Sequence, residues 1–384
     1  MIRELVEFQS PPGLSSGERF RVIYRLEGSE DEALARARDI CLEQTVEFPD
    51  DLIPEGFIRD SVLGRIESFG KGAHGSFEAV IGFPVETAAG ELTQLLNVVF
   101  GNISIKPGIF VQALDLSASL YARFTGPRFG IAGLRRVLGA ENRPLLSTAL
   151  KPMGLTARGL ASLAGRFALG GIDLIKDDHG LTDQPFAPFE ERVARCAQAV
   201  MDANRETGMR CLYAPNVTAP AHLVVARARY AKEAGAGALL VAPGITGPDA
   251  MRLLAAENDI GLPILAHPAL QGSFVMGGNG ISHYCIFGQL ARLAGADASI
   301  FPNFGGRFSF SRDECGSIAR GCREPMGPLA PIFPSPGGGM TLENVPEMRE
   351  FYGNDVVYLM GGGLFRHSDD LAENCRHFRK LVGG

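Results

Sequence analysis

The feature that most constrains the fold of this 384-residue chain is a series of short apolar segments that begins near residue 145. They recur at intervals of roughly 25–40 residues, and the stretches between them have helical periodicity. Three of them, in FALGGIDLI, KEAGAGALLV and RLAGADASIF, follow a helix that ends in glycine. Eight consecutive strand–helix units over about 240 residues predict a closed (β/α)8 TIM barrel rather than an open, doubly wound sheet. The predicted strands cover residues 145–150, 173–178, 211–216, 238–243, 263–268, 298–303, 330–336 and 356–363.

The first third of the chain has a different pattern. Strands are predicted at 19–28, 65–70, 76–85 and 108–117, and helices at 31–46 and 91–103. This β-α-β-β-α-β order is typical of a ferredoxin-like unit. We therefore predict an α/β protein in which a ferredoxin-like α+β domain at residues 1–125 precedes a TIM-barrel domain at residues 126–384.

Composition excludes several classes of protein. The chain is 46% hydrophobic with a formal net charge of −6, which suits a globular enzyme and gives no basic surface for nucleic acid. No apolar run approaches the roughly 20 residues that a membrane-spanning helix needs, and the N-terminal residues do not resemble a secretory signal. The 7 cysteines are scattered without a CxxC pair, so we expect reduced thiols in a cytoplasmic protein.

Polar residues gather where the second predicted barrel strand ends, in the run Lys176-Asp177-Asp178-His179. Active sites of TIM barrels lie at the carboxyl ends of the strands. Strand alternation predicts that Lys176 and Asp178 point to one side and Asp177 and His179 to the other. A carboxylate beside an amine favours a divalent-cation site, although an internal Lys–Asp ion pair would have the same pattern.

Two triple-glycine runs, 337–339 and 361–363, follow the seventh and eighth predicted strands. Barrels often bind phosphate there, because backbone N–H groups point at the anion and glycine lets the backbone approach closely. Tight turns would explain the same residues. From the residues alone we predict a metal-assisted enzyme that acts on a phosphorylated small molecule.

These strand-end motifs resemble those of the ribulose-bisphosphate carboxylase (RuBisCO) large-chain family. The resemblance covers nearly the whole chain. It implies that Lys151 relays protons at the substrate carbon, that Lys176 takes up CO₂ to become a carbamate that binds Mg²⁺, and that Asp178 is the next metal ligand. The motifs that carry it are LKPMG, GGIDLIKDDH, FPNFGGRFSF and YLMGGGLFRH, in that order.

The resemblance also implies contacts with the substrate and with a second subunit. It places Asn216 beside the site and makes His267 a catalytic residue that contacts the substrate's hydroxyls. Arg307 stands where the carboxylases have a flexible-loop lysine, and we predict that Asn216 and Arg307 bind the substrate. Glu43 falls where the family has a glutamate contributed by the neighbouring subunit, and Asn97 lies one residue from the aligned position of a substrate-holding asparagine. We therefore expect a homodimer or a higher homo-oligomer. The phosphate-binding backbone positions are Gly338, Gly339, Gly362 and Gly363.

Three departures from the family's carboxylases indicate its non-carboxylating branch, the RuBisCO-like proteins. Met153 replaces a lysine that carboxylation needs, and methionine has neither charge nor donor. His179 replaces the third metal-binding carboxylate, and imidazole is a softer ligand that suits Mg²⁺ poorly, so water is the other candidate for that position. Pro268 replaces a phosphate-binding arginine, which favours a monophosphate substrate.

RuBisCO-like proteins catalyse several reactions that share an enolate. Our first expectation is decarboxylation or cleavage of a 3-oxo sugar-acid phosphate, such as 3-oxo-isoapionate 4-phosphate in apionate breakdown. In methionine salvage, the alternatives are a 2,3-diketo-5-methylthiopentyl-1-phosphate enolase and a 5-methylthioribulose-1-phosphate isomerase. A non-catalytic paralogue that binds a phosphorylated metabolite is a further alternative, although a proton-relay lysine beside a metal site argues against it.

Overall fold

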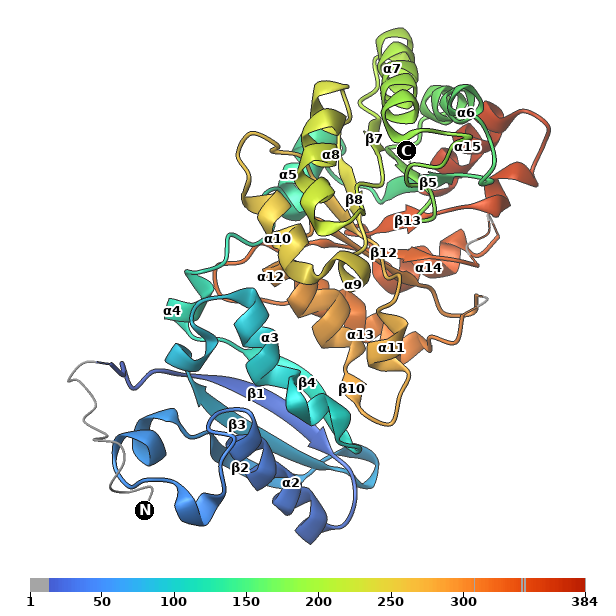
Figure 1. Ribbon diagram of the computed structural model, residues 1–384. Coiled ribbons are helices and arrows are strands. Elements are labelled where there is room, and N and C mark those ends of the chain that lie inside the picture. The colour runs from blue at the N-terminus through green and yellow to red at the C-terminus, as the bar shows by residue number, and fades with distance from the viewer. Residues whose placement is uncertain (1–13, 307, 340, 342, 384) are drawn as a thin grey trace. The chain divides into compact units, whose positions relative to one another are not determined.

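The computed structural model describes residues 14–306, 308–339, 341 and 343–383, which form two compact units (Figure 1). The first unit contains the described residues up to Phe124 together with Gly272–Ile286. The second contains Thr125–Gln271 and the described residues from Phe287 onward. Within the described part of the chain, no helix has the length and apolar character needed to cross a bilayer.

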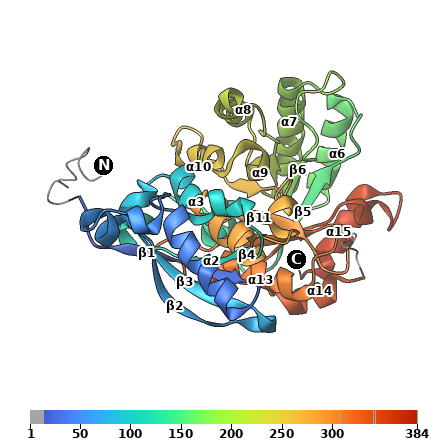
Figure 2. The ribbon, with the colours of Figure 1, turned by 60° about the horizontal axis from the view of Figure 1, so that its bottom comes forward.

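The first unit is built on a sheet with the strand order β10-β4-β1-β3-β2. In β1, side chains alternate between buried and partly exposed, as the period of two predicts for a sheet with one covered face. Helix α2 contacts β1, β2 and β3 (Figure 2) and begins with a capping box between Ser29 and Glu32. The ferredoxin-like element order is confirmed. The elements are β1 (Arg19–Leu26), α2 (Glu30–Glu43), β2 (Arg65–Lys71), β3 (Phe77–Pro84), α3 (Leu92–Phe100), β4 (Ile109–Asp115), α4 (Ala118–Tyr121), α11 (Gly272–Val275) and β10 (Gly280–Ile281).

Strand β10 reaches the first unit from far along the chain. It pairs in parallel with β4, with Gly280 opposite Phe110. The side-chain amide of Asn279 donates to the carbonyl of Lys106 at 3.1 Å and so fixes the approach to this strand. The sequence pattern predicts this segment within the barrel domain, because a two-residue strand leaves no periodicity to detect, whereas residues Gly272–Ile286 belong to the first unit.

The second unit is an eight-stranded parallel barrel with the order β7-β6-β5-β13-β12-β11-β9-β8. A bridge between Asn216 and Leu240 joins the two end strands. All eight predicted strands are present, and their inward residues form one apolar core that includes Leu145, Leu240 and Phe333. The strands are β5 (Leu145–Leu150), β6 (Leu174–Asp177), β7 (Leu212–Ala214), β8 (Leu239–Val241), β9 (Ile264–Ala266), β11 (Ala298–Pro302), β12 (Phe333–Gly337) and β13 (Val357–Leu359).

Helices cover the outside of the barrel, and α6, α7 and α8 lie beside β5–β8 in Figure 1. Their apolar positions face the strands, as in α6, where Leu160, Ala164 and Phe167 are buried. The helices are α5 (Gly130–Leu138), α6 (Ala157–Leu169), α7 (Phe189–Thr207), α8 (Ala221–Glu233), α9 (Pro243–Thr246), α10 (Pro248–Ala256), α12 (Ala291–Leu293), α13 (Arg312–Arg323), α14 (Val345–Tyr352) and α15 (Leu371–Leu381).

Candidate active site

Lys176 is a buried amine inside the barrel near the end of β6. Its side chain is almost inaccessible, with 2% exposure for the residue, and Nζ donates to the main-chain oxygen of Asp177 at 3.0 Å. Burial lowers the pKa of Lys176 to about 8; the nearby Asp178 carboxylate opposes this shift and the Lys151 charge adds to it. Because only a neutral amine attacks CO₂, this environment suits carbamate formation at moderate pH.

One carboxylate oxygen of Asp178 accepts from two donors. Lys151 Nζ lies 2.7 Å from Oδ1, and His179 Nδ1 lies 3.3 Å from the same atom. Burial raises the pKa of Asp178, but the hydrogen bonds from His179 and Lys151 and the charge of Lys176 lower it more, so it lies well below its usual range. The Lys–Asp ion pair that the sequence left open is therefore formed by Lys151.

His179 lies on the same side as Asp178, and the prediction that it would point the other way is wrong. Alternation holds only while the chain is extended, and β6 ends at Asp177. The ring of His179 stacks on that of His267, with centroids 4.4 Å apart and planes 12° from parallel. Burial, followed by the charges of Lys176 and His179, lowers the pKa of His267 to about 2. His267 Nδ1 accepts from the Ala269 N–H at 3.2 Å, which places the ring proton of the neutral imidazole on Nε2.

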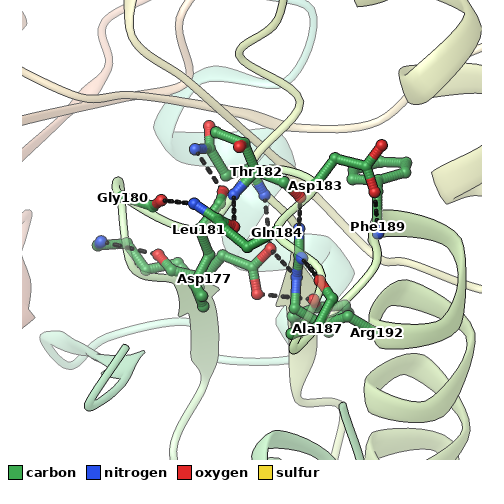
Figure 3. A network of polar contacts seen from close by, with 12 residues as sticks. Asp177, Gly180, Leu181, Thr182, Asp183, Gln184, Ala187, Phe189 and Arg192 are labelled. Atoms are coloured by element: carbon green, nitrogen blue, oxygen red, sulfur yellow. Dashed lines mark hydrogen bonds and ion pairs between the residues drawn. The ribbon is translucent and has the colours of Figure 1, made fainter. Parts of the chain in front are cut away.

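Asp177 points away from this group into a buried polar network (Figure 3). Arg192 Nε donates to its Oδ2 at 3.1 Å, and the Tyr213 hydroxyl donates to Oδ1 at 2.8 Å. The other guanidinium nitrogens of Arg192 donate to the carbonyls of Ala187 at 2.8 Å and Thr182 at 2.7 Å. One buried ion pair thus ties β6 to the loop that follows Asp178.

Asn216 fixes the same loop from the other side. Asn216 is 1% exposed, and its side-chain amide donates to the carbonyls of His179 and Leu181, each at 2.9 Å. Its Oδ1 accepts from the Thr218 N–H at 3.1 Å. The structure therefore places Asn216, which the sequence predicts to bind the substrate, in the support of the Asp178–His179 backbone.

The glycine loops after β12 and β13 have the backbone freedom that a close approach requires. Gly338 and Gly339 have φ of +78° and +85°, where a side chain would be strained. A Cβ on Gly306 would lie 2.3 Å from the Gly338 carbonyl oxygen, so the loop after β11 packs directly on the loop after β12. Gly362 and Gly363 open the short turn that follows β13. Arg307, assigned to substrate binding, lies outside the described residues.

In the first unit, Glu43 belongs to a charged cluster. Its Oε1 accepts from the side-chain amide of Asn102 at 3.0 Å and its Oε2 from Lys106 Nζ at 3.1 Å. Asn97 instead donates to Gln94 at 3.5 Å. The asparagine beside Glu43 is therefore Asn102, which the sequence pattern does not single out. No sequence spacing indicates this contact, because it joins residues that lie 59 positions apart.

Comparisons with known proteins agree with this geometry. The family described as "Ribulose bisphosphate carboxylase large chain, catalytic domain" matches residues 130–305. A 5-methylthioribulose-1-phosphate isomerase from Rhodospirillum rubrum is 40% identical over 368 residues, which are 96% of this chain and 97% of the isomerase. The chain belongs to the RuBisCO large-chain family.

Other members of the RuBisCO family show which branch this is. A 2,3-diketo-5-methylthiopentyl-1-phosphate enolase from Geobacillus thermodenitrificans is 35% identical over 306 residues, covering 79% of this chain and 74% of the enolase. The crystal structure of a Rubisco-like protein from Rhodopseudomonas palustris has a TM-score of 0.86 at 39% identity and covers 95% of this chain and 97% of that chain. The chain is a RuBisCO-like, non-carboxylating member of the family, as its sequence predicts.

Proposed function

We propose that this RuBisCO-like protein forms an enolate by moving a proton on a phosphorylated ketose, with 5-methylthioribulose 1-phosphate as the first substrate to test. The contact of Lys151 with Asp178, close to the buried amine of Lys176, carries the proposal. The 40% identity to an isomerase of that name over nearly the whole chain supports it. Decarboxylation of a 3-oxo sugar-acid phosphate and the enolase reaction stay predictions from the sequence, and the experiment below tests the first of them.

The residues at this site fit Mg²⁺ only with a modified Lys176. Among the described residues, no three His, Cys, Asp or Glu side chains are grouped so that they could hold a metal ion. A carbamate on Lys176 would add hard oxygen donors beside Asp178, and the partly neutral amine suits its formation. We propose that carbamylated Lys176, Asp178 and His179 hold Mg²⁺. When bound, the ion would stabilise negative charge that develops on substrate oxygens.

The protein's own side chains and backbone move the proton, bind the substrate and support the metal-binding loop. The Lys151 side chain is 42% exposed and anchored on Asp178, so its amine can reach a substrate carbon and move the proton. His267 presents Nε2–H as a neutral donor for a substrate hydroxyl. The backbone N–H groups of the glycine loops after β12 and β13 bind the phosphate. Asp177 and Asn216 hold the loop that carries Asp178 and His179.

A substitution at Lys151 tests this assignment. Purified protein with Mg²⁺ and bicarbonate in D₂O is followed by ¹H and ¹³C NMR on 5-methylthioribulose 1-phosphate and on a 3-oxo sugar-acid phosphate. We expect deuterium to enter the methylthio compound, and Lys151→Met to reduce the rate by about 10²–10⁴-fold. Lys232→Met, on the exposed face of α8, is the matched control and should leave the rate unchanged. Full activity of Lys151→Met would refute the role of Lys151, and CO₂ release from the sugar acid alone would identify a decarboxylase.

We also propose that Glu43 and Asn102 of one chain complete the active site of a partner chain in a homodimer. The cluster of Glu43, Asn102 and Lys106 lies on the first unit, and the side chain of Glu43 is 24% exposed. Mixing an inactive Lys151→Met chain with an inactive Glu43→Ala chain should restore about a quarter of the activity, because random pairing gives mixed dimers with one intact site. No recovery on mixing and refolding, with both chains folded, would refute shared sites.

A further inference from the structure

The turn that follows β13 has two backbone donors without a partner. It spans Gly362–Phe365, and within the described residues the N–H groups of Gly362 and Gly363 donate to no acceptor. A Cβ on Gly361 or Gly362 would meet no described atom within 4 Å, so the space beside this backbone is open. Among the turn's own bonds, the Leu364 N–H donates to the Gly361 carbonyl at 3.1 Å. A glycine-rich turn this short needs support from elsewhere to keep its N–H groups in place.

The side chain of Asn374, in α15, supplies such support. Asn374 is 0% exposed, and its amide nitrogen donates to the carbonyl of Leu364, within the turn, and to that of Ser368, just beyond it, each at 2.8 Å. Its Oδ1 accepts from the Ser368 hydroxyl at 2.6 Å. Both N–H donors and the oxygen of this amide are therefore used on one short segment of the chain. The contact also satisfies a carbonyl at the end of a helical turn, where no partner exists within the turn itself.

Helix α15 is fixed to the barrel close to Asn374. Cys375 is 0% exposed and packs on the end of α6, where a Cβ on Gly170 would clash with it. One helical turn further on, Arg379 donates to the Gly171 carbonyl at 2.6 Å and lies 3.3 Å from the buried carboxylate of Asp173. Asn374 therefore projects from a firm support onto a glycine turn that has few bonds of its own.

We infer that Asn374 is a positioning residue for phosphate binding, because it holds the turn after β13 so that the N–H groups of Gly362 and Gly363 meet the anion together. The inference rests on the proposed function, since it takes the phosphate to bind at the glycine loops. It adds a determinant of affinity that is buried behind the site and does not touch the ligand. Donors that are aligned before binding need no ordering when the anion arrives, so affinity falls in proportion to the fraction of time for which the alignment is kept.

Inorganic phosphate tests this role without requiring turnover. The dissociation constant of the full chain for phosphate is measured by ³¹P NMR titration. Asn374→Ala should raise it about 10-fold, which corresponds to a turn that keeps its binding conformation about a tenth of the time. Asn204→Ala is the matched control. Asn204, in α7, donates to the Cys211 carbonyl at 2.9 Å and accepts from the Cys211 N–H at 2.8 Å, but it does so before β7, at the opposite end of the barrel. The control should lower the free energy of unfolding and leave phosphate binding unchanged.

A second variant and a kinetic measurement separate positioning from folding. Ser368→Ala changes an exposed residue and removes the hydroxyl that orients the Asn374 amide, so it should raise the dissociation constant for phosphate several-fold. With 5-methylthioribulose 1-phosphate as substrate, Asn374→Ala should raise KM about 10-fold and leave kcat nearly unchanged, because contacts to the phosphate hold the ground state and the transition state equally. A lower kcat at an unchanged KM would overturn the inference.

The outcomes separate this inference from the proposed function. The inference fails if the unaltered protein shows no saturable phosphate binding, or if folded Asn374→Ala binds phosphate as tightly as the unaltered protein. It also fails if Asn204→Ala weakens phosphate binding equally, because the effect would then be one of general stability. If Asn374→Ala does not fold, an unchanged dissociation constant in Ser368→Ala overturns the inference. Phosphate binding that weakens in Asn374→Ala, in a protein that does not turn over the methylthio compound, supports the inference and refutes only the proposed reaction.

Discussion

Neutralising Asp177 should destabilise the barrel, because its partner Arg192 would keep a buried charge without a counter-charge. Both side chains are 0% exposed, and Arg192 Nε lies 3.1 Å from Asp177 Oδ2. Removing one partner of a buried ion pair costs about 3–5 kcal/mol. In Asp177→Asn, the guanidinium would retain its bonds to the carbonyls of Thr182 and Ala187, so we expect a value near the lower end, about 3 kcal/mol.

A double-mutant cycle tests the magnitude. Arg192→Met should cost a similar amount, because Asp177 would keep only the Tyr213 hydroxyl and the Asn216 N–H as donors. The double variant should cost less than the sum of the two single changes by about 1–3 kcal/mol, since neither charge is then left unpaired. Urea unfolding is followed by circular dichroism, as the chain contains no tryptophan.

An exposed ion pair is the matched control for this cycle. Asp202→Asn and Arg205→Met remove a pair whose side chains are 58% and 71% exposed, and they should leave the unfolding midpoint nearly unchanged.

Asp177→Asn should also weaken Mg²⁺ binding by about 10–100-fold, because it loosens the loop after β6 that carries Asp178 and His179. The reasoning would be refuted if the double variant lost as much free energy of unfolding as Asp177→Asn and Arg192→Met lose together, to within about 0.5 kcal/mol.

Two further predictions follow from Lys176 and Gly306. A pKa of about 8 in the folded state, against 10.5 when unperturbed, means that the charged amine costs the fold about 3 kcal/mol below pH 8, and this cost disappears as the pH rises to 10.5. Lys176→Met should therefore be more stable than the unaltered protein at pH 7 in bicarbonate-free urea unfolding, and the advantage should vanish by pH 10.5; a constant difference would contradict the shift. Gly306→Ala would place a Cβ 2.3 Å from the Gly338 carbonyl oxygen and should raise KM for the phosphorylated substrate about 10-fold or more, whereas Gly165→Ala in α6 should not. An unchanged KM in Gly306→Ala would show that the two loops adjust without cost.

The sequence by itself determined the architecture and the chemistry of the strand ends. Parallel strands that are buried on both faces form near-continuous apolar runs, so all eight barrel strands could be recognised from runs such as LLSTAL and from the glycines that end the preceding helices. Lys176 and Asp178 could be placed on one face, with Asp177 opposite, because alternation is a local property of an extended chain. The run of these residues and the two glycine loops also made membership in the RuBisCO family recognisable.

Only the tertiary structure decided which of these groups meet. His179 turns back beside Asp178 because the strand ends one residue after Lys176, and a loop's path depends on partners such as Asn216 and Arg192 that lie far away in sequence. Asn102, rather than Asn97, contacts Glu43, because the chain's path after α3, and not sequence spacing, places its amide there. Asn374 shows the same limit, since its contact with Leu364 depends on the packing of α15 against the end of α6. Pairing across long sequence separations is set by the closed barrel, and no local pattern encodes it.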